Sequence, residues 1–454
     1  MKPSSAREII LSAPEASCHP WPRHVLAPAV WSAMATALAD APALALRGLW
    51  ADPTHVHALL HDTTTDALLP VSVAAVDGAY AALSPQRPEA AWFERMVADL
   101  WGHRASGGLD ARPWLDHGKW PQHRPLGPQP MAPAGAAEPP ALLPPAREDM
   151  FQIPLGPVLP GIAEAAHLRL TVAGETVARA EFRLGYLHKG TLALMRGKSP
   201  RAAGRFAARR SGDATVAHSV AFARAAEAAA QTEAPARAAA LRNVMLEMER
   251  LANHFADCAA IAAAAGFAPP QAGLLGLREF VLAAAARVFG HRLMMDVCIP
   301  GGLAADAPVD FSETILALAA TLDRESVQPL RLCRESRLLA DRTGGEGGGR
   351  LHARLADIPA AIARLRAHAA ALPDGPIAVS LPMGTGEGIG CVDGHRGFIF
   401  HWLRLAGGQI AAAFLCDPGW LQFPLLESAL LGAAIEDVPV VVACFACSVS
   451  GVDL

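Results

Sequence analysis

The chain of 454 residues lacks the features that mark several common classes of protein. None of its apolar runs reaches the roughly eighteen residues that a membrane-crossing helix needs. It has no block of basic residues, and its net charge of −4 argues against nucleic acid as a partner. No Ser-His-Asp arrangement and no His-Glu-x-x-His motif can be recognised, so the common hydrolase and zinc-protease chemistries are not expected.

Tyrosine and closely spaced cysteines are also rare. The two tyrosines are Tyr80 and Tyr186, so the second half of the chain contains none. Of the eight cysteines, only Cys444 and Cys447 lie close together in sequence. Because the N-terminus carries no signal peptide, we expect reduced thiols and a cytoplasmic location.

The spacing of apolar residues predicts a small α/β domain over residues 1–125. Three short apolar segments separated by polar or Gly/Asp breaks favour strands at 43–49, 56–60 and 69–76. A helical pattern follows from Ala90, and Gly102 is expected to end that helix.

A linker and a larger domain are predicted after residue 125. Residues 126–148 are rich in Pro and Ala and have little periodicity, which is typical of a linker. Within 149–454, alternating runs at 167–172 and 177–184 predict a β-hairpin. Helical spacing then predicts a mainly α-helical domain with helices at 218–230, 236–265, 275–295, 311–339 and 351–372. The predicted fold class is therefore α+β.

Two glycine-rich segments, 343–349 and 384–390, superficially suggest phosphate-binding loops. Neither has the G-x-x-x-x-G-K-[ST] spacing, and neither contains a lysine. We predict instead that both are backbone turns whose glycines adopt positive φ.

The predicted helix of the N-terminal domain carries a motif. Residues 90–102 read A-A-W-F-E-R-M-V-A-D-L-W-G, and a D-x-R-x-W-L stretch follows at 110–115. This pattern resembles the 30 kDa hydrophilic subunit of respiratory complex I, which docks on a large subunit. The resemblance implies a 30 kDa-like domain fused to a large-subunit-like domain.

The second domain carries a longer series of motifs. They are G-P-x-x-x-G-I at 156–162, R-L-G-Y-L-H-K-G at 183–190, S-G-D-x-x-V-A-H at 211–218, E-x-E-R-L-A-N-H-x-x-D at 247–257, G-H-R-x-M-x-D at 290–296, R-G-x-x-x-H-W at 396–402 and D-P-x-W-L-x-x-P at 417–424. Their order resembles that of the large subunit shared by complex I (its 49 kDa subunit) and the membrane-bound, group 4 nickel–iron hydrogenases. The resemblance implies a hydrogenase-large-subunit-like fold.

The metal-ligand positions depart from that family. Where the family has four cysteines around a nickel–iron centre, this chain has Ser211, Ala214, Cys444 and Cys447. A hydroxyl and a methyl group cannot replace soft thiolates, so we expect no nickel–iron centre and no cofactor bound by this chain. The two cysteines are then vestigial ligands, either packed or able to bind a stray metal. Only 448–454 follow them, so no maturation cleavage is expected.

The resemblance also indicates where other family functions are lost. The glutamate that begins the hydrogenase proton path corresponds to Leu192, and the quinone-binding histidine of complex I corresponds to Leu159. No tyrosine follows Tyr186 to make the second contact to a quinone.

Five polar residues remain as candidates for a catalytic role. Asp213 beside His218 is the best proton-relay candidate, because a carboxylate can fix the tautomer of an imidazole or raise its pKa. Arg396 corresponds to the arginine that overhangs the metal centre in hydrogenases, and it can neutralise a carboxylate or bind an anion. His188 and His254 are further candidates, although such a histidine is more often a hydrogen-bonded core residue than a ligand.

Two functions follow from the resemblance. In the first, the chain is a core subunit of an NADH:quinone oxidoreductase-like or hydrogenase-related complex, with quinone and NAD binding among the expected features. It would relay electrons from an iron–sulfur cluster in a small partner subunit. In the second, it is a catalytically silent scaffold. Expected partners are the small iron–sulfur subunit, a ferredoxin-like subunit and membrane subunits that hold the chain at the inner face of the membrane.

Overall fold

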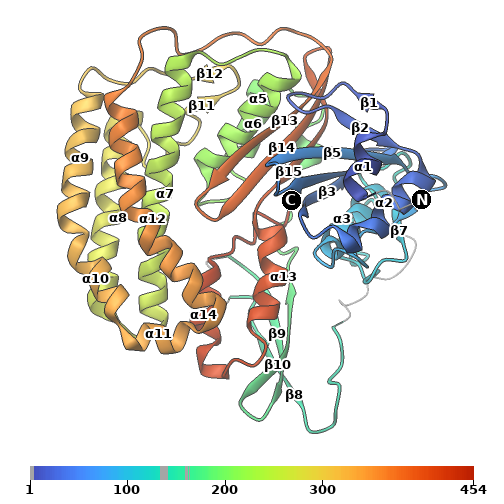
Figure 1. Ribbon diagram of the computed structural model, residues 1–454, viewed down its shortest axis with the longest axis horizontal. Helices are drawn as coiled ribbons and strands as arrows, with labels where there is room; N and C mark the ends of the chain where they lie inside the picture. The colour runs from blue at the N-terminus through green and yellow to red at the C-terminus, as the bar shows by residue number, and fades with distance from the viewer. Residues whose placement is uncertain (1–4, 133–141, 159–161, 163) are drawn as a thin grey trace.

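The computed structural model describes residues 5–132, 142–158, 162 and 164–454. Figure 1 shows an N-terminal sheet with its helices on one side, a long helical bundle on the other, and a second sheet between them. A third sheet extends away from the rest of the molecule beside helix α13 (Gly419–Ala429). The predicted α+β class is confirmed. Within the described ranges, no helix has the length and apolar character needed to span a membrane.

The N-terminal unit is a five-stranded sheet in the order β1-β2-β5-β4-β3. Its strands are β1 (Glu15–Ala16), β2 (Arg23–Leu26), β3 (Leu44–Ala51), β4 (His55–Asp62) and β5 (Ala67–Ala74), and only β2 and β5 pair in parallel. The three predicted strands are therefore confirmed. The helices of this unit are α1 (Ala6–Leu11), α2 (Pro28–Ala37) and α3 (Ala90–Trp101), with a short parallel pair of β6 (Ala79–Ala81) and β7 (Arg104–Ser106). Gly102 ends α3 with φ +79°, as predicted.

The predicted hairpin is present as β9 (His167–Ala173) and β10 (Thr176–Arg183), and β8 (Phe151–Leu155) adds a third strand. Gly174 allows the tight turn with φ +62°. The predicted linker falls partly on 133–141, which lie outside the described residues. Leu159, the position expected to correspond to the quinone-binding histidine, also lies outside them. The domain boundary at 126–148 stays a prediction.

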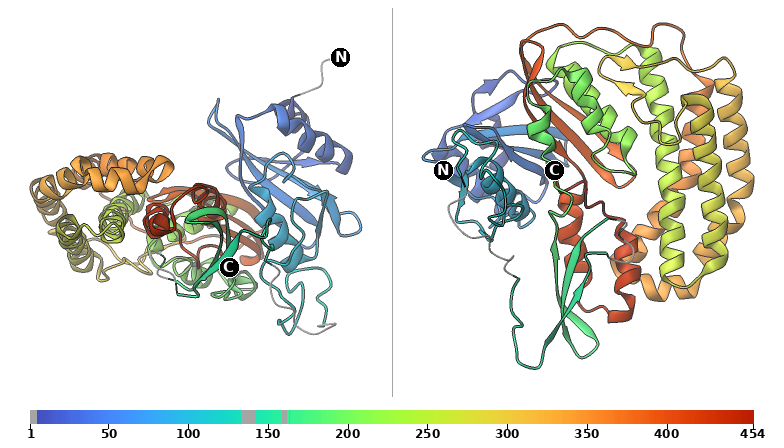
Figure 2. Two further views of the ribbon diagram at one scale, coloured as in Figure 1. Left: turned by 90° about the horizontal axis from the view of Figure 1, so that it is seen from below. Right: turned by 180° about the vertical axis from the view of Figure 1, so that it is seen from behind.

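The helical bundle comprises α7 (Ala236–Ala264), α8 (Ala268–Phe289), α9 (Phe311–Glu325), α10 (Val327–Glu335), α11 (Arg337–Thr343) and α12 (Gly345–Ala370), seen from two further sides in Figure 2. The single helix predicted at 311–339 is wrong, because the chain bends at Ser326 and Ser336. Ser336 is extended, and its hydroxyl accepts a hydrogen bond from the Leu339 amide, which starts a new helix. The turn predicted at 343–349 is wrong as well, since α12 begins at Gly345 and only Gly344 has a positive φ there.

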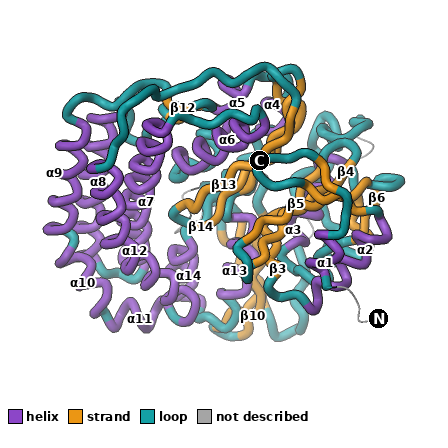
Figure 3. Tube along the Cα trace, turned by 45° about the horizontal axis from the view of Figure 1, so that its top comes forward, coloured by secondary structure: helices purple, strands orange, loops and turns teal. Residues whose placement is uncertain are grey.

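The central sheet is an antiparallel meander of β13 (Gly386–Gly394), β14 (Gly397–Ala406) and β15 (Gln409–Cys416) (Figure 3). The turn predicted at 384–390 is therefore wrong, because most of it is strand. Helix α6 (Thr215–Ala229) packs on β13. A Cβ at Gly388 or Gly390 would lie 2.4 or 2.2 Å from a backbone carbonyl of α6. The glycines are there because helix and strand backbones meet without side chains between them.

The remaining short elements connect these layers. They are α4 (Thr191–Met195), α5 (Pro200–Ala207), the β11–β12 pair (Cys298–Ile299 and Gly302–Leu303) and α14 (Val438–Phe445), together with the single 3-10 turns Leu38–Asp40 and Ile435–Asp437.

The N-terminal unit is joined to the central sheet by buried ion pairs. Arg404 of β14 donates hydrogen bonds to Asp52 at 2.7 Å and to Glu387 at 3.2 Å. Arg23 of β2 binds Glu387 from the other side at 2.8 Å. His19 also exchanges two backbone hydrogen bonds with β13. The two units therefore share one continuous polar seam.

Candidate functional site

The candidate site lies at one end of the central sheet, where three loops meet. The first loop precedes α6 and contains Ser211 and Asp213. The second is the turn between β13 and β14, where Gly394 pairs with Gly397 and Arg396 projects from the turn. The third follows β15 and begins with Asp417. Residues that are about two hundred positions apart in sequence therefore become neighbours.

Arg396 is the centre of the cluster. Its guanidinium donates to the Asp213 carboxylate, to the Ser211 hydroxyl at 2.9 Å and to Asp417 at 3.4 Å. Only 2% of its side chain is exposed. Ser211 donates in turn to Asp213 at 2.6 Å. Arg396 therefore neutralises two carboxylates, which is one of the roles predicted for it. Its guanidinium also binds Ser211, the serine at a position where the resembled motif has a cysteine.

His218 pairs with Asp417, not with Asp213. Its Nε2 lies 3.0 Å from Asp417 Oδ2, and its Nδ1 lies 2.9 Å from His401 Nε2. Both members of the pair are fully buried. The predicted Asp213–His218 relay is therefore wrong. Asp213 is only two residues from Ser211, and the start of α6 turns the His218 side chain toward β14 and β15 instead.

The hydrogen bonds assign the tautomers of the two histidines. Burial lowers the pKa of His218 despite the neighbouring Asp417, and burial lowers the pKa of His401 well below its usual value. Both rings are therefore neutral. His218 then donates through Nε2 to the Asp417 carboxylate and accepts through Nδ1 from His401. Neither imidazole therefore carries a positive charge at neutral pH.

The cluster contains buried cations as well as carboxylates. Burial opposes ionisation of both Asp213 and Asp417, but Arg396 and the hydrogen bonds that each carboxylate accepts together hold the pKa of each carboxyl below its usual value. Arg210 is the second buried cation. Burial lowers its pKa to about 10, so it stays protonated at neutral pH, and it donates to the Gly451 carbonyl at 2.7 Å. Arg396 is thus paired with both carboxylates, whereas Arg210 makes no ion pair among the described residues and is held by the Gly451 carbonyl.

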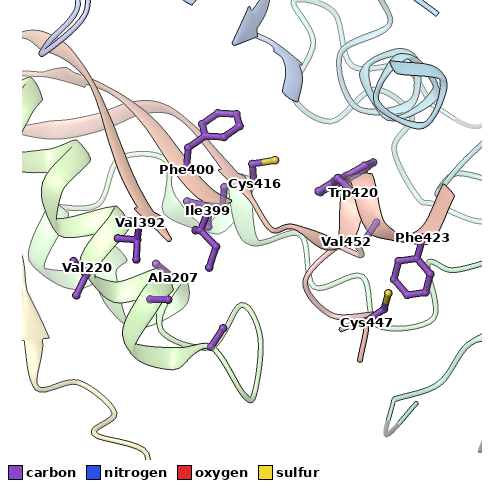
Figure 4. Close-up of a cluster of buried hydrophobic side chains, with 14 of the residues drawn as sticks. Ala207, Val220, Val392, Ile399, Phe400, Cys416, Trp420, Phe423, Cys447 and Val452 are labelled. Atoms are coloured by element: carbon purple, nitrogen blue, oxygen red, sulfur yellow. The ribbon is translucent and has the colours of Figure 1, made fainter. Parts of the chain in front are cut away.

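Cys444 and Cys447 face different neighbours. The Cys444 sulfur packs against Gly347 at the start of α12, where a Cβ would lie 3.4 Å from it. The Cys447 sulfur lies 4.0 Å from the Gln422 amide oxygen of α13. Cys447 also belongs to a cluster of buried hydrophobic side chains (Figure 4). Across the described part of the chain, no group of three or more His, Cys, Asp or Glu side chains is placed to hold a metal ion.

A small cavity of about 100 Å³ opens beside Asp213. Glu249 lines it from α7 and accepts hydrogen bonds from the Val216 and Ala217 amides at 2.6 and 2.9 Å. Burial raises the pKa of Glu249 to about 8, although those two amides lower it. Asn253 also lines the cavity and donates to the Asp213 carbonyl. The cavity therefore connects the exposed edge of Asp213 with a protonatable buried carboxyl.

The other two candidate histidines are held elsewhere. His188 shares a 2.7 Å hydrogen bond with the Asp453 carbonyl, and its ring stacks on Trp120. Burial lowers its pKa. His254 bonds to Asp357 of α12 at 3.0 Å. Neither position makes the residue part of the Arg396 cluster.

Sequence reasoning missed three members of this site. Asp417, which was not singled out within its motif, anchors both His218 and Arg396. His401 and Glu249 were also not singled out. Each of the three lies in one of the motifs described above: Asp417 in 417–424, His401 in 396–402 and Glu249 in 247–257. A polar residue within such a motif is the sequence signal that could have identified them.

Comparisons with known proteins agree with this architecture. Residues 189–258 match the family model for nickel-dependent hydrogenases, and residues 265–357 match the model for the 49 kDa subunit of respiratory-chain NADH dehydrogenase. The chain is 26% identical to hydrogenase-4 component G of Escherichia coli (strain K12) over 421 residues, covering 81% of this chain and 75% of that protein. This coverage exceeds the predicted large-subunit-like domain, so the likeness extends into the N-terminal part.

Two further relatives align over shorter stretches. Formate hydrogenlyase subunit 5 of the same organism is 28% identical over 59% of this chain, and a subunit of the NADH-quinone oxidoreductase of Orientia tsutsugamushi (strain Boryong) is 30% identical over 42%. The chain spans about half the length of each, 49% in both cases. A chain of the membrane-bound sulfane sulfur reductase, an archaeal respiratory membrane complex, shares the fold with a TM-score of 0.64 at 17% identity, covering 68% of this chain and all of that one.

Proposed function

Because this chain is a relative of the nickel-dependent hydrogenases and of the 49 kDa subunit of respiratory-chain NADH dehydrogenase, we propose that it is the large-subunit-like component of a membrane-associated electron-transfer complex. We propose further that it holds no nickel–iron centre and acts chiefly as a scaffold for its neighbours. The observation that supports this most directly is the clamp of Arg396 on Ser211, Asp213 and Asp417.

The donor set does not fit a nickel–iron centre. Such a centre needs four soft thiolates, and only Cys444 and Cys447 can supply them here. Ser211 is already committed to Asp213 and Arg396 by hydrogen bonds of 2.6 and 2.9 Å. Introducing a metal would require this buried ion-pair cluster to open, and leaving a buried charge unpaired is costly.

The proposed setting is an assembly like those of the relatives. The partners are a small iron–sulfur subunit, a ferredoxin-like subunit and membrane subunits, which hold this chain at the inner face of the membrane. Electrons then pass through clusters in the partners. Quinone or NAD binding is part of this proposed setting of the assembly, and the Arg396 cluster has no role in it.

A second candidate function is proton relay to an acceptor during turnover. The cavity beside Asp213 and Glu249 favours it, since a carboxyl whose pKa is raised to about 8 can exchange protons near neutrality. The cavity volume of about 100 Å³ is too small for a quinone head group and is suited to a few water molecules. Organic ligands generally occupy pockets of about 300–1,000 Å³. This cavity therefore favours proton transfer through water molecules and does not favour the binding of an organic acceptor.

The metal proposal is tested by isolating the intact assembly through a tag on this chain, from cells grown with added nickel. We expect far less than one nickel per chain by mass spectrometry of metals. The Cys444→Ser/Cys447→Ser double variant should assemble and turn over like the parent. Stoichiometric nickel in the parent that disappears in the double variant would contradict the proposal.

The scaffold and relay candidates are separated by filling the cavity. Gly212 lines it, and a Cβ there would meet nothing within 4 Å. Gly212→Leu should therefore fold and assemble normally. Unchanged quinone reduction per assembled complex supports a scaffold, whereas a several-fold loss with normal assembly supports the relay. Gly349→Leu, which is also free of close contacts but lies near the start of α12 and does not line the cavity, is the matched control.

A further inference from the structure

A second, larger cavity lies at the seam between the N-terminal unit and the hairpin sheet. Its volume is about 510 Å³, within the range of about 300–1,000 Å³ that small-molecule sites occupy. Its walls come from α3, the loop over 110–117, β10 and α13. It shares no lining residue with the Arg396 cluster.

The apolar lining of this cavity is partly aromatic and partly aliphatic. The rings of Trp92 and Trp114 lie 4.3 Å apart between centroids, and Trp92 stacks on Phe423 of α13 at 5.9 Å. Leu421 and Leu425 of α13 supply aliphatic surface. Flat apolar walls of this kind favour an aromatic or aliphatic body.

The charged lining is uneven. Four guanidiniums line the cavity, from Arg95, Arg112, Arg179 and Arg183, together with the His117 ring and the carboxyl groups of Glu89, Asp110, Glu181 and Glu427. Asp110 pairs with both Arg95 and Arg112, and Glu181 pairs with both Arg112 and Arg179. Each of these two carboxylates is therefore shared by two cations.

Arg183 is the guanidinium of these four for which the described residues provide no ion pair. Its guanidinium lies 5.2 Å from the centre of the Tyr186 ring, and among the described residues no carboxylate lies within 4.0 Å of it. Its Nε is buried without a hydrogen-bond partner. A half-buried cation of this kind is a favourable place for an anionic group.

We propose that this cavity binds a small amphipathic monoanion, with an aromatic or aliphatic body against the apolar lining and one carboxylate or sulfonate group at Arg183. The site is separate from the electron-transfer role proposed above and does not depend on it.

Glu427 of α13 supports this assignment. One carboxyl oxygen accepts the Phe182 amide at 2.6 Å. The pKa of Glu427 is raised to about 8, chiefly by burial and also by Glu181 of β10, although the Phe182 amide, Arg95 of α3 and Arg112 of the adjoining loop lower it. At neutral pH Glu427 is therefore mostly a neutral acid that can donate a hydrogen bond to the bound anion. Above pH 8 it becomes a competing anion.

The test uses 8-anilinonaphthalene-1-sulfonate, a fluorescent aromatic sulfonate whose charge does not change between pH 6 and 9, titrated into the purified full chain. We expect saturable binding at one site, displaced by decanoate. Arg183→Gln should weaken binding by about tenfold or more, since a charge-assisted contact is lost. Arg287→Gln, at a pair with a 66% exposed side chain on α8, should leave binding unchanged.

Two further variants keep the outcome clear. Ala91→Trp fills the cavity from α3 without altering a charge, and it should abolish binding while circular dichroism shows an intact fold. In the parent, affinity should fall by about tenfold between pH 7 and 9 as Glu427 ionises, and Glu427→Gln should remove that dependence. Absence of saturable binding, or equal affinity in the parent, Arg183→Gln and Ala91→Trp proteins, would overturn the proposal.

Discussion

Arg396 Nη2 lies 2.9 Å from the hydroxyl of Ser211, so a guanidinium contacts the residue that replaces the first cysteine of the family's metal-ligand motif. The same guanidinium binds Asp213 and Asp417. Charge pairs therefore connect the three loops that meet at this end of the molecule. The stability of this end of the molecule should accordingly depend on those pairs.

The first prediction concerns Asp417→Asn. The substitution removes the charge that faces both His218 and Arg396 in a fully buried position. We expect the free energy of unfolding to fall by about 3 kcal/mol, because one buried cation loses a partner. Chemical denaturation followed by circular dichroism measures the change.

The matched control for that prediction is Glu279→Gln. Glu279 pairs with Arg292, and both side chains are more than half exposed. Its loss should cost less than about 1 kcal/mol. Equal effects of the two substitutions would show that the buried cluster contributes no more than a surface ion pair.

The second prediction concerns Gly388→Ala in β13. The added methyl group would lie 2.4 Å from the Ala225 carbonyl oxygen and from the Ala229 amide nitrogen of α6. Because backbone cannot move aside as a side chain can, we expect a loss of about 2 kcal/mol or more in the free energy of unfolding. Gly349→Ala is the control: it lies in α12 with no atom within 4 Å, and it should stabilise the protein by about 0.5 kcal/mol. A neutral Gly388→Ala would mean that α6 does not lie against β13.

Residue spacing predicted much of the secondary structure but not the breaks within it. The N-terminal strands and the long helix α7 follow from regular apolar periodicity, which local sequence carries. The segment over 311–339 keeps a helical pattern while the chain bends at Ser326 and Ser336, because packing against α8 and α12 overrides local propensity.

Contacts between residues that are far apart in the chain could not be predicted from the sequence, for a different reason. The strand over 386–394 reads as a turn because glycines occur there for the close approach of α6, a contact between segments more than 150 residues apart. The partner of Asp417 could likewise not be predicted, because only the fold brings His218 beside it. Motif order placed the candidate residues in the right regions, but the pairing among them is a property of the tertiary structure.

The third prediction concerns the two cysteines. Cys444 is fully buried and Cys447 is 7% exposed. Burial also raises the pKa of each thiol to about 12, so little thiolate is present at neutral pH. Iodoacetamide at pH 7.5 should therefore modify neither residue in the native protein within an hour, and both in guanidinium chloride, as read by peptide mass spectrometry. Rapid native modification of either would show that the thiols are accessible.

The fourth prediction concerns the seam between the N-terminal unit and the central sheet. Glu387 binds Arg23 and Arg404 and accepts a hydrogen bond from Trp402 at 2.9 Å. Although burial opposes its ionisation, these partners hold the pKa of Glu387 below its usual value. Glu387→Gln should lower the free energy of unfolding by about 3 kcal/mol at pH 7. The difference from the parent should begin to shrink as the pH falls below 4.5, the ordinary pKa of glutamate, and should vanish once the folded carboxyl of the parent is protonated.

The last prediction follows from Glu427, whose behaviour with pH has the opposite sign. Its pKa is raised by burial to about 8 in the folded chain, against 4.5 for an ordinary glutamate. Between these two values the unfolded chain has released the proton while the folded chain still holds it, so the contribution of this group to stability falls as the pH rises from 5 to 8 and levels off above 8. The loss is on the order of 2–4 kcal/mol. Urea unfolding of the parent and of Glu427→Gln at pH 5 and pH 8 measures it: the parent should lose more stability than the variant over this interval. Parallel losses in the two proteins would place the pKa of Glu427 near its ordinary value and would remove the pH dependence expected for anion binding at the seam cavity.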